Sequence, residues 1–298
     1  MAGVASPARA TDARTLAPLA LVFNAFTWGV SWWPFRQLEG AGLHPLWLTA
    51  ITFGVAVAGL LLARPRALGE VLRTPALWTL VLAAGTTNAC FNWGVTIGDV
   101  VRVVLLFYLM PLWAVLLARP LLGERIHAAA VLRIVLALVG AVVVLWPRNG
   151  TDLAAFTLPD VLGLVGGFSF ALNNVMLRRE AKRSEPARAL AMFGGGMLIA
   201  LLLALVQWQA GRIGPPPAPA FGWVIGTAAL AAWFVASNLA LQYGAARLAA
   251  ATTAVIMLTE VVFASASALL LGAGALDART AIGGALILSA AALAALRR

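Results

Sequence analysis

The chain has 298 residues, of which 62% are hydrophobic and only 11% are charged, and its mean hydropathy is +0.94. Soluble domains carry about 25% charged residues, so this composition excludes a soluble enzyme or a soluble binding domain. The formal charge of +10 would suit a nucleic-acid partner, but the basic residues lie between long apolar runs, where they indicate membrane topology instead.

Ten apolar runs are long enough to cross a bilayer, because a helix needs about 20 apolar residues to span the roughly 30 Å hydrocarbon core. They leave no stretch long enough for a soluble domain. The predicted fold is therefore an all-α polytopic membrane protein with ten transmembrane helices. The predicted spans are residues 15–36, 43–63, 75–97, 100–118, 126–146, 157–177, 187–208, 219–243, 248–271 and 276–296.

The first and third predicted spans carry amide and aromatic side chains within their apolar runs. Asn24 and Trp28 lie in the first span, and Asn88, Phe91 and Asn92 lie in the third. Asn88 and Asn92 are four residues apart and therefore share one helix face. Polar groups inside a span usually face the bundle interior or a watery cavity. We therefore predict that the three amides contact a solute and that Trp28 and Phe91 form an aromatic wall.

The fourth predicted span combines a charged outer end with a proline in its middle. Asp99 and Arg102 are three residues apart, which allows a salt bridge within the first turn, and Arg102 is also a candidate for an outer gate. Tyr108 follows and adds to the predicted aromatic wall. Pro111 removes one backbone hydrogen bond, so we expect a kink or hinge there, with a gating role if the helices move.

The sixth and eighth predicted spans repeat the amide pattern. Asn173 lies in the sixth span, and Asn238, Gln242 and Tyr243 lie in the eighth. Neutral hydrogen-bonding groups among apolar walls suit a small zwitterionic or amphipathic solute, so all four are predicted to bind substrate. The alternative is that these side chains hold helices together, as amides and hydroxyls commonly do in membranes.

Glu260 is the only carboxylate deep within a predicted span. An acid at that depth could relay protons, and we predict a coupling or gating role for it. Alternatively, it pairs with a buried cation such as Arg133 and locks helices together. Cys90 is the only cysteine, and neither His44 nor His127 has metal-ligand neighbours in the sequence. Neither a metal site nor a cofactor is predicted.

The basic residues are distributed unevenly between the two ends of the predicted spans. If the N-terminus is inside, 15 of the Lys and Arg residues lie in cytoplasmic segments and 5 in outer segments. This bias is the one that the positive-inside rule describes. We therefore predict that both termini are cytoplasmic.

A weak internal repeat divides the chain into halves at residues 1–148 and 155–298. A shift of 150 residues places Thr87 and Asn88 on Ser237 and Asn238, and a shift of 142 relates the first span to the sixth. Each half holds five predicted spans, and because five is odd, the second half enters the membrane with the opposite orientation. Inverted repeats of this kind are typical of carriers that open alternately to the two sides.

The segment Phe107-Tyr-Leu-Met-Pro-Leu-Trp-Ala114, followed by Leu122-Gly-Glu-Arg125, resembles the EamA type of the drug/metabolite transporter superfamily. Within that family it is most similar to the YddG-like amino-acid exporters of the bacterial inner membrane. The second half departs from the pattern, with Gly272-Ala-Gly274 in place of the Gly-Glu pair and Val261 where a proline is common. The resemblance implies a central cavity lined by helices 1, 3, 4, 6, 8 and 9, with helices 5 and 10 behind it.

The same resemblance implies export of aromatic and other neutral amino acids across the bacterial inner membrane. A close alternative is an efflux carrier for drugs or other small metabolites with the same fold. An intramembrane enzyme would need a cluster of His, Asp or Glu near one interface, which the sequence lacks, so no enzyme is predicted. The expected partners are a small solute and the lipid bilayer, with no nucleic acid, and the expected state is a monomer or weak homodimer.

Overall fold

The computed structural model describes residues 7–123, 128–145, 156–245, 256–257, 259–274 and 277–296, and within these ranges the regular structure is helical. The helices are α1 Pro7–Val30, α2 Trp32–Gly40, α3 Pro45–Ala63, α4 Arg66–Arg73, α5 Pro75–Ile97, α6 Val100–Phe107, α7 Met110–Leu122, α8 Ala128–Leu145, α9 Leu158–Arg179, α10 Glu185–Gln209, α11 Phe221–Ala245, α13 Thr259–Leu270 and α14 Ala278–Leu296.

Local sequence signals set where several helices begin. Pro45 and Pro75 occupy the first turns of α3 and α5, where a missing backbone N–H costs nothing and the fixed φ suits a helix. The Asp99 side chain accepts the backbone N–H of Arg102 at 3.0 Å and so caps α6. The Ser184 side chain caps α10 in the same manner. These caps satisfy backbone donors that a helix leaves unpaired at its start.

Two predicted spans are interrupted in the structure. The first does not continue as one helix to residue 36, because the chain turns at Ser31 and resumes as α2. The fourth breaks at Tyr108 and Leu109, between α6 and α7. Pro111 is the second residue of α7, so the break lies two to three residues before the proline at which a kink is predicted. Proline is tolerated in the first turn of a helix, so the interruption lies before it.

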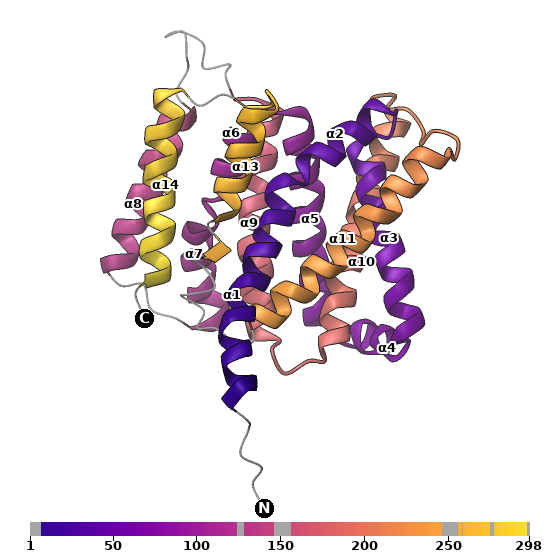
Figure 1. The fold of residues 1–298 in the computed structure, drawn as a ribbon, viewed down its shortest axis with the longest axis horizontal. Helices are drawn as coiled ribbons and strands as arrows, with labels where there is room; N and C mark the ends of the chain where they lie inside the picture. The colour runs from indigo at the N-terminus through magenta and orange to yellow at the C-terminus, as the bar shows by residue number, and fades with distance from the viewer. Residues whose placement is uncertain are drawn as a thin grey trace, which may run out of the picture.

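The helices lie side by side in one bundle (Figure 1). The principal contacts join α5 to α9 and α10, α1 to α11 and α13, and α3 to α10 and α11. Helices α6 and α7 both pack on α9. Helices α8 and α14 pack mainly on each other and form one side of the bundle in Figure 1. The arrangement of helices 5 and 10 behind a central cavity stays a prediction.

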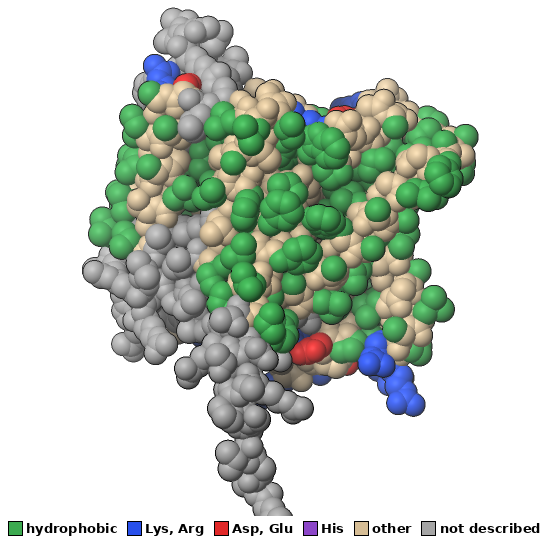
Figure 2. Space-filling model, viewed as in Figure 1, with side chains coloured by type: hydrophobic (Ala, Val, Ile, Leu, Met, Phe, Trp, Pro, Cys, Tyr) green, Lys and Arg blue, Asp and Glu red, His purple; other side chains and the backbone are tan. Residues whose placement is uncertain are grey.

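Four described helices, α3, α9, α10 and α11, are long and apolar enough to cross a membrane. A fifth candidate is the pair α4 and α5, which is bent by 101°. Large apolar side chains are exposed on the outside of the bundle, with Leu62 87% and Leu270 85% accessible, and hydrophobic atoms cover much of the face in Figure 2. These features indicate a multi-pass membrane protein. The count of ten spans in inverted repeats stays a prediction.

The two ends of the bundle differ in what they contain. The start of α1, the end of α14, α4 and the turn between α9 and α10 lie at the lower end in Figure 1. Helix α2 and the starts of α6 and α9 lie at the upper end. Both ends of the described chain therefore lie on the same side of the bundle, and polar contacts between its helices are found at both ends.

Candidate functional site

The interrupted helix α6–α7 meets α13 inside the bundle, and their contact is the centre of the candidate site. The hydroxyl oxygen of Tyr108 lies 3.0 Å from Glu260 Oε2 and 2.9 Å from the carbonyl oxygen of Met257. Tyr108 stands at the break between α6 and α7, and Glu260 is the second residue of α13. Both are buried, with Tyr108 1% and Glu260 7% accessible. The phenol thus shares its one hydrogen between two acceptors from the other half of the chain.

Helix α1 closes one side of this contact. A Cβ on Gly29 would lie 2.8 Å from the backbone carbonyl oxygen of Glu260 and 2.8 Å from the Cβ of Phe263. Real Cβ atoms do not approach other atoms this closely, so only glycine allows α1 to lie against the start of α13 here. The acid is consequently held between α1 and the α6–α7 break.

Aromatic rings form a continuous series beside the contact. Trp28 of α1 meets Phe91 of α5 edge-on at 6.1 Å, Phe91 meets Phe107 of α6 at 4.9 Å, and Phe107 meets Phe170 of α9 at 5.3 Å. Phe107 also lies 6.2 Å from the ring of Tyr108. The predicted wall residues Trp28, Phe91 and Tyr108 are thus joined through Phe107. The series links the two halves of the chain.

Three predicted amides are buried and keep one unpaired oxygen. Asn24 donates to the Oγ of Ser237 at 2.7 Å and to its carbonyl oxygen at 2.9 Å, and Asn92 donates to Thr49 Oγ1 at 3.1 Å. Asn173 lies 3.4 Å from the side chain of its neighbour Asn174. The Oδ1 atoms of Asn24, Asn92 and Asn173 have no hydrogen-bond partner. An unsatisfied buried acceptor costs about 1–3 kcal/mol, so each of these oxygens would gain from a donor.

The remaining predicted binding residues have different surroundings. The Asn88 amide donates to the carbonyl oxygen of Ala84 in its own helix at 2.7 Å, whereas Asn92 is fully buried against α3. Asn238 and Tyr243 are half-buried in α11. The side chain of Gln242 lies outside the described part, as does that of Arg133. The described contacts therefore join Tyr108 to Glu260 and Trp28 to Phe91, and they link the amides to separate neighbours.

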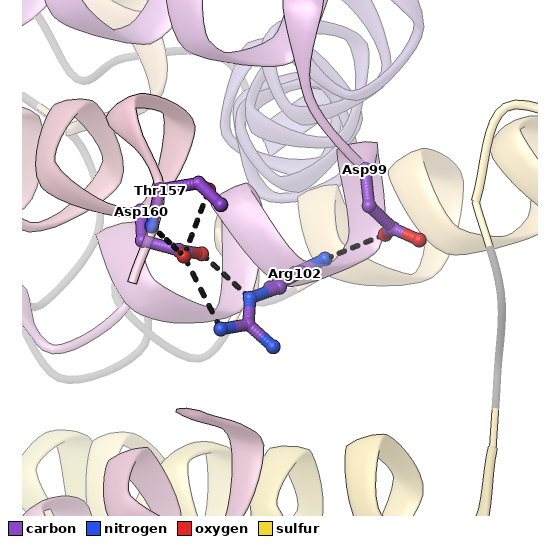
Figure 3. Close-up of polar contacts among 4 residues, drawn as sticks. All are labelled: Asp99, Arg102, Thr157 and Asp160. Carbon is purple, nitrogen blue, oxygen red and sulfur yellow. Dashed lines mark hydrogen bonds and ion pairs between the residues drawn. The ribbon is translucent and has the colours of Figure 1, made fainter. Parts of the chain in front are cut away.

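Arg102 forms an ion pair between the first and second halves at the upper end of the bundle (Figure 3). Its Nε lies 2.6 Å from Asp160 Oδ1, and its Nη2 lies 3.2 Å from Oδ2. Asp160 is 1% accessible, and its Oδ2 also accepts from the backbone N–H and the hydroxyl of Thr157, each at 2.9 Å. Asp99 instead accepts the backbone N–H of Arg102. The bidentate pair therefore ties α6 to the start of α9.

Metal binding has no support among the described residues, because no three His, Cys, Asp or Glu side chains there lie close enough to hold an ion. His44 has a structural place at the start of α3. Its Nδ1 accepts the backbone N–H of Leu46 at 3.2 Å, and burial lowers the pKa of the imidazole. A neutral ring is the form that accepts this bond. His127 lies outside the described residues.

Comparison with known proteins finds a family that is similar to the first half of the chain. Residues 15–146 match the model of the EamA-like transporter family. Residues 15–146 are therefore similar to an EamA-like domain. This match indicates a membrane transporter of small solutes and not an enzyme. No curated protein matches the chain, and the comparison leaves the YddG-like subgroup as a prediction.

The fold of the whole chain also has a counterpart among solved structures. One crystal structure, described only as that of a protein, is similar with a TM-score of 0.58 and 23% sequence identity. The match covers 93% of this chain and 96% of that one. At this identity the likeness concerns the fold alone. The likeness in fold therefore extends through the second half, beyond the residues that match the family model.

Sequence inspection missed Asp160 as the partner of Arg102, although the residues carry a signal for its position. Thr157 and Asp160 have the spacing of a capping box, which marks a helix start and places an acid in its first turn. That pattern locates Asp160 at the same end of the bundle as Arg102. Pairing across 58 residues of chain needs the packing of α6 on α9, which no local pattern provides. Arg102, in the first half of the chain, thus forms its ion pair with a residue of the second half.

Proposed function

We propose that this protein exports neutral amino acids, aromatic ones included, by alternating access between two inverted halves, residues 1–148 and 155–298. The observation that carries the proposal is the contact of Tyr108 with Glu260. It joins a broken helix of one half to the start of a helix in the other, beside aromatic rings. Substrate sites of carriers are commonly built where discontinuous helices of two repeats meet near the middle of the membrane.

The helix contacts support two related halves. If α1, α3, α5, α6–α7 and α8 correspond to α9, α10, α11, α13 and α14, the contact of α1 with α11 corresponds to that of α9 with α5. The contacts of α1 with α13 and of α9 with α7 correspond in the same manner, as do those of α3 with α11 and α10 with α5. The pairs α3–α10 and α8–α14 each join two corresponding helices, as expected at the pseudo-two-fold axis that relates the halves. A bundle of unrelated helices has no reason to repeat its contacts in this order.

A pair of ring contacts supports the same relation at the level of side chains. Phe26 and Phe263 meet edge-on at 5.4 Å and 87°. Trp113 and Phe168 meet edge-on at 5.6 Å and 80°. The shifts of 142 and 150 residues found in the sequence carry Phe26 to Phe168 and Trp113 to Phe263. Each ring of one pair therefore corresponds to a ring of the other.

The inverted orientation is supported by which helix ends lie together. The end of α11 packs on the start of α1, since a Cβ on Gly244 would lie 2.9 Å from the carbonyl oxygen of Ala17. The start of α9 instead lies beside the end of α5, where a Cβ on Gly94 would lie 3.3 Å from the Cβ of Leu162. In Figure 1, α9 begins at the upper end of the bundle and α1 at the lower end, as a second half of opposite orientation requires.

The polar groups inside the bundle, at the contact and on other helices, suit an amino acid. A carboxylate and unpaired amide oxygens accept hydrogen bonds from an ammonium group, and the rings of Trp28 and Phe91 offer apolar surface to a side chain. The Tyr108 hydroxyl also offers a simple coupling device. When Glu260 is ionised, the phenol donates to it; when Glu260 carries a proton, the acid can donate to the phenol, which then donates to the carbonyl oxygen of Met257. Protonation of Glu260 thereby changes which acceptor receives the hydrogen of the Tyr108 hydroxyl.

The same features favour one second candidate, an efflux carrier for lipophilic cations. A single acid beside several aromatic rings attracts a cation by both charge and cation–π contact. Amino acids remain our first proposal because unpaired acceptors on three helices suit a donor-rich head group better than a cation without N–H groups.

Counterflow in proteoliposomes separates these two functions. Purified full-length protein is reconstituted into vesicles loaded with millimolar unlabelled phenylalanine, leucine or a lipophilic cation, and entry of the labelled form of each is followed. We expect counterflow of the neutral amino acids and little of the cation. Counterflow of the cation alone would establish the second candidate and contradict the first. Protein-free vesicles and vesicles loaded with aspartate serve as controls.

We further propose that the lower end of the bundle in Figure 1, with both chain ends, faces the cytoplasm of a bacterial cell and that the bundle lies in the inner membrane. The arginines of α4 and those around the turn between α9 and α10 lie at this end, as the positive-inside rule favours. Accessibility of single cysteines introduced near either end to a membrane-impermeant reagent in whole cells tests this orientation.

A further inference from the structure

The short helix α4 lies across the end of the bundle rather than along it, at 101° to α5. Its residues divide into three stripes by helical spacing. Ala67 and Val71 are buried against the protein, whereas Leu68 and Leu72 are 44% and 57% accessible. The third stripe is polar and lies on the side opposite to the two leucines. A helix with this division lies flat at a membrane surface, with its apolar side toward the acyl chains.

The polar stripe of α4 forms one wall of an open hollow of about 720 Å³. Arg66, Glu70 and Arg73 line it from α4, and Arg183 lines it from the turn before α10. Basic side chains gather at this end of the molecule in Figure 2. Among the described residues, Arg66 and Arg73 have no carboxylate within salt-bridge distance. The hollow thus combines three guanidinium groups with one carboxylate.

That carboxylate is already engaged. Glu70 Oε2 accepts the hydroxyl of Ser184 at 2.5 Å, and Oε1 accepts the backbone N–H of Ser184 at 3.1 Å. These bonds, that of the hydroxyl first, lower the pKa of the Glu70 carboxyl, so it stays ionised and holds α4 to the start of α10. Arg183 has a partner of its own, since its Nε lies 3.3 Å from Glu180 Oε2. Arg66 and Arg73 are therefore the two guanidinium groups of the hollow without a carboxylate partner among the described residues.

We propose that this hollow binds the phosphate of an anionic phospholipid from the cytoplasmic leaflet. Guanidinium groups match phosphate oxygens in geometry and charge. The exposed Leu68 and Leu72 on the opposite side of the same helix, together with Leu62 at the end of α3, supply apolar surface for the acyl chains. A soluble phosphate would use the arginines but gain nothing from these leucines, so the occupant is a lipid.

Lipid binding to purified full-length protein in a neutral detergent tests the proposal, with native mass spectrometry to count bound lipids during titration. The probes are dioleoyl phosphatidylglycerol, dioleoyl phosphatidylcholine and free glycerol 3-phosphate. Each basic residue near an anionic surface contributes about fivefold in affinity. We therefore expect Arg66→Gln with Arg73→Gln to weaken phosphatidylglycerol binding by about twentyfold, with phosphatidylcholine unaffected.

Matched variants distinguish lipid binding in this hollow from general attraction of lipid to basic residues at this end of the bundle. Arg119→Gln with Arg179→Gln removes the same charge from exposed positions at the same end of the bundle and should change phosphatidylglycerol binding less than twofold. Arg66→Lys with Arg73→Lys keeps the charge and should retain most binding, which guards against misfolding of the glutamine variant. Equal losses in the control pair, or equal binding of the two lipids, would overturn the proposal. Binding of glycerol 3-phosphate as tight as that of the lipid would overturn the choice of occupant.

Discussion

The hydroxyl group of Tyr108 has two hydrogen-bond acceptors, and both belong to the second half of the chain. Glu260 and the carbonyl oxygen of Met257 both accept a hydrogen bond from this one donor. At the scale of single residues, the contact of Tyr108 with Glu260 is therefore both a link between the halves and a place where one proton alters the link.

Tyr108→Phe should destabilise the protein by about 1–3 kcal/mol, because it leaves buried acceptors without a donor. Thermal unfolding in detergent, followed by the fluorescence of the 11 tryptophans, measures the loss. Glu260→Gln and the double variant complete a cycle, in which we expect the two changes to be non-additive because the residues are in contact. Strictly additive losses would show that the hydrogen bond contributes nothing to stability.

Glu260→Gln should remove the dependence of transport on external pH while a low rate of exchange remains. The amide fills the same volume and still accepts from Tyr108, but it cannot gain or lose a proton. Initial uptake rates between pH 5.5 and 8.5 measure the effect. Glu185→Gln, at an exposed position at the start of α10, is the matched control and should keep the parent profile. An unchanged profile in Glu260→Gln would exclude a proton-coupling role for this acid.

Pairs of helices are held by contacts at their ends and by close approach at their middles. Arg102 and Asp160 hold α6 to α9 at the end that we assign to the outside. At the same end, Arg36 of α2 donates from Nη2 to the carbonyl oxygens of Val95 and Gly98 at the end of α5, where a cation also complements the helix dipole. Movement of the halves that opens this end has to break such contacts.

Asp160→Asn should open the outer end more often, because it replaces a charge-assisted bidentate pair with a weaker neutral hydrogen bond. Cys90 is a natural reporter, since it is the only cysteine and is 6% accessible within α5. We expect a membrane-impermeant maleimide to label Cys90 about tenfold faster in Asp160→Asn, which corresponds to a loss of about 1.4 kcal/mol.

Asp277→Asn is the control for this labelling, because Asp277 lies at the same end and accepts the backbone N–H of Thr280 at the start of α14 at 2.8 Å. Its labelling rate should equal that of the parent protein. If Asp160→Asn remains folded and labels no faster than the parent, the ion pair does not restrain the outer end.

Close approach of α5 and α10 depends on Gly195, where an added Cβ would collide with the backbone carbonyl of Val81. Its neighbour Gly194 has no atom within 4 Å of the corresponding position. Gly195→Ala should therefore destabilise the protein by about 1–3 kcal/mol through overpacking, whereas Gly194→Ala should be neutral or stabilising by up to about 1 kcal/mol. Thermal unfolding in detergent compares the two, and equal effects would contradict the assigned packing.

At the scale of the whole molecule, the sequence predicts what depends on local composition. Apolar runs place the helices near their observed bounds, and Pro45 and Pro75 mark two starts because a proline suits only the first turn. The break at Tyr108 and Leu109 lies just before the predicted kink at Pro111, since a proline restricts the residues before it as well as its own position. Helix α4 was not predicted, because eight amphipathic residues resemble a basic loop.

Contacts between distant segments could not be predicted in this manner. The polar residues of the candidate site are visible in the sequence, but Asn24 with Ser237 and Arg102 with Asp160 are joined only by packing of helices from different halves. Burial and pairing of an amide or an acid depend on the neighbour that the fold supplies. The internal repeat comes nearest to a prediction of packing, because the shifts of 142 and 150 residues also relate observed ring contacts.

Net uptake by proteoliposomes tests the central claim most directly. Vesicles that contain the full-length protein are exposed to a panel of labelled amino acids, with and without a pH gradient, and accumulation is compared with protein-free vesicles. The account predicts saturable uptake of neutral amino acids, aromatic ones among them, which other neutral amino acids compete away and charged ones do not. Absence of uptake of every amino acid by protein that is folded and correctly inserted would contradict it.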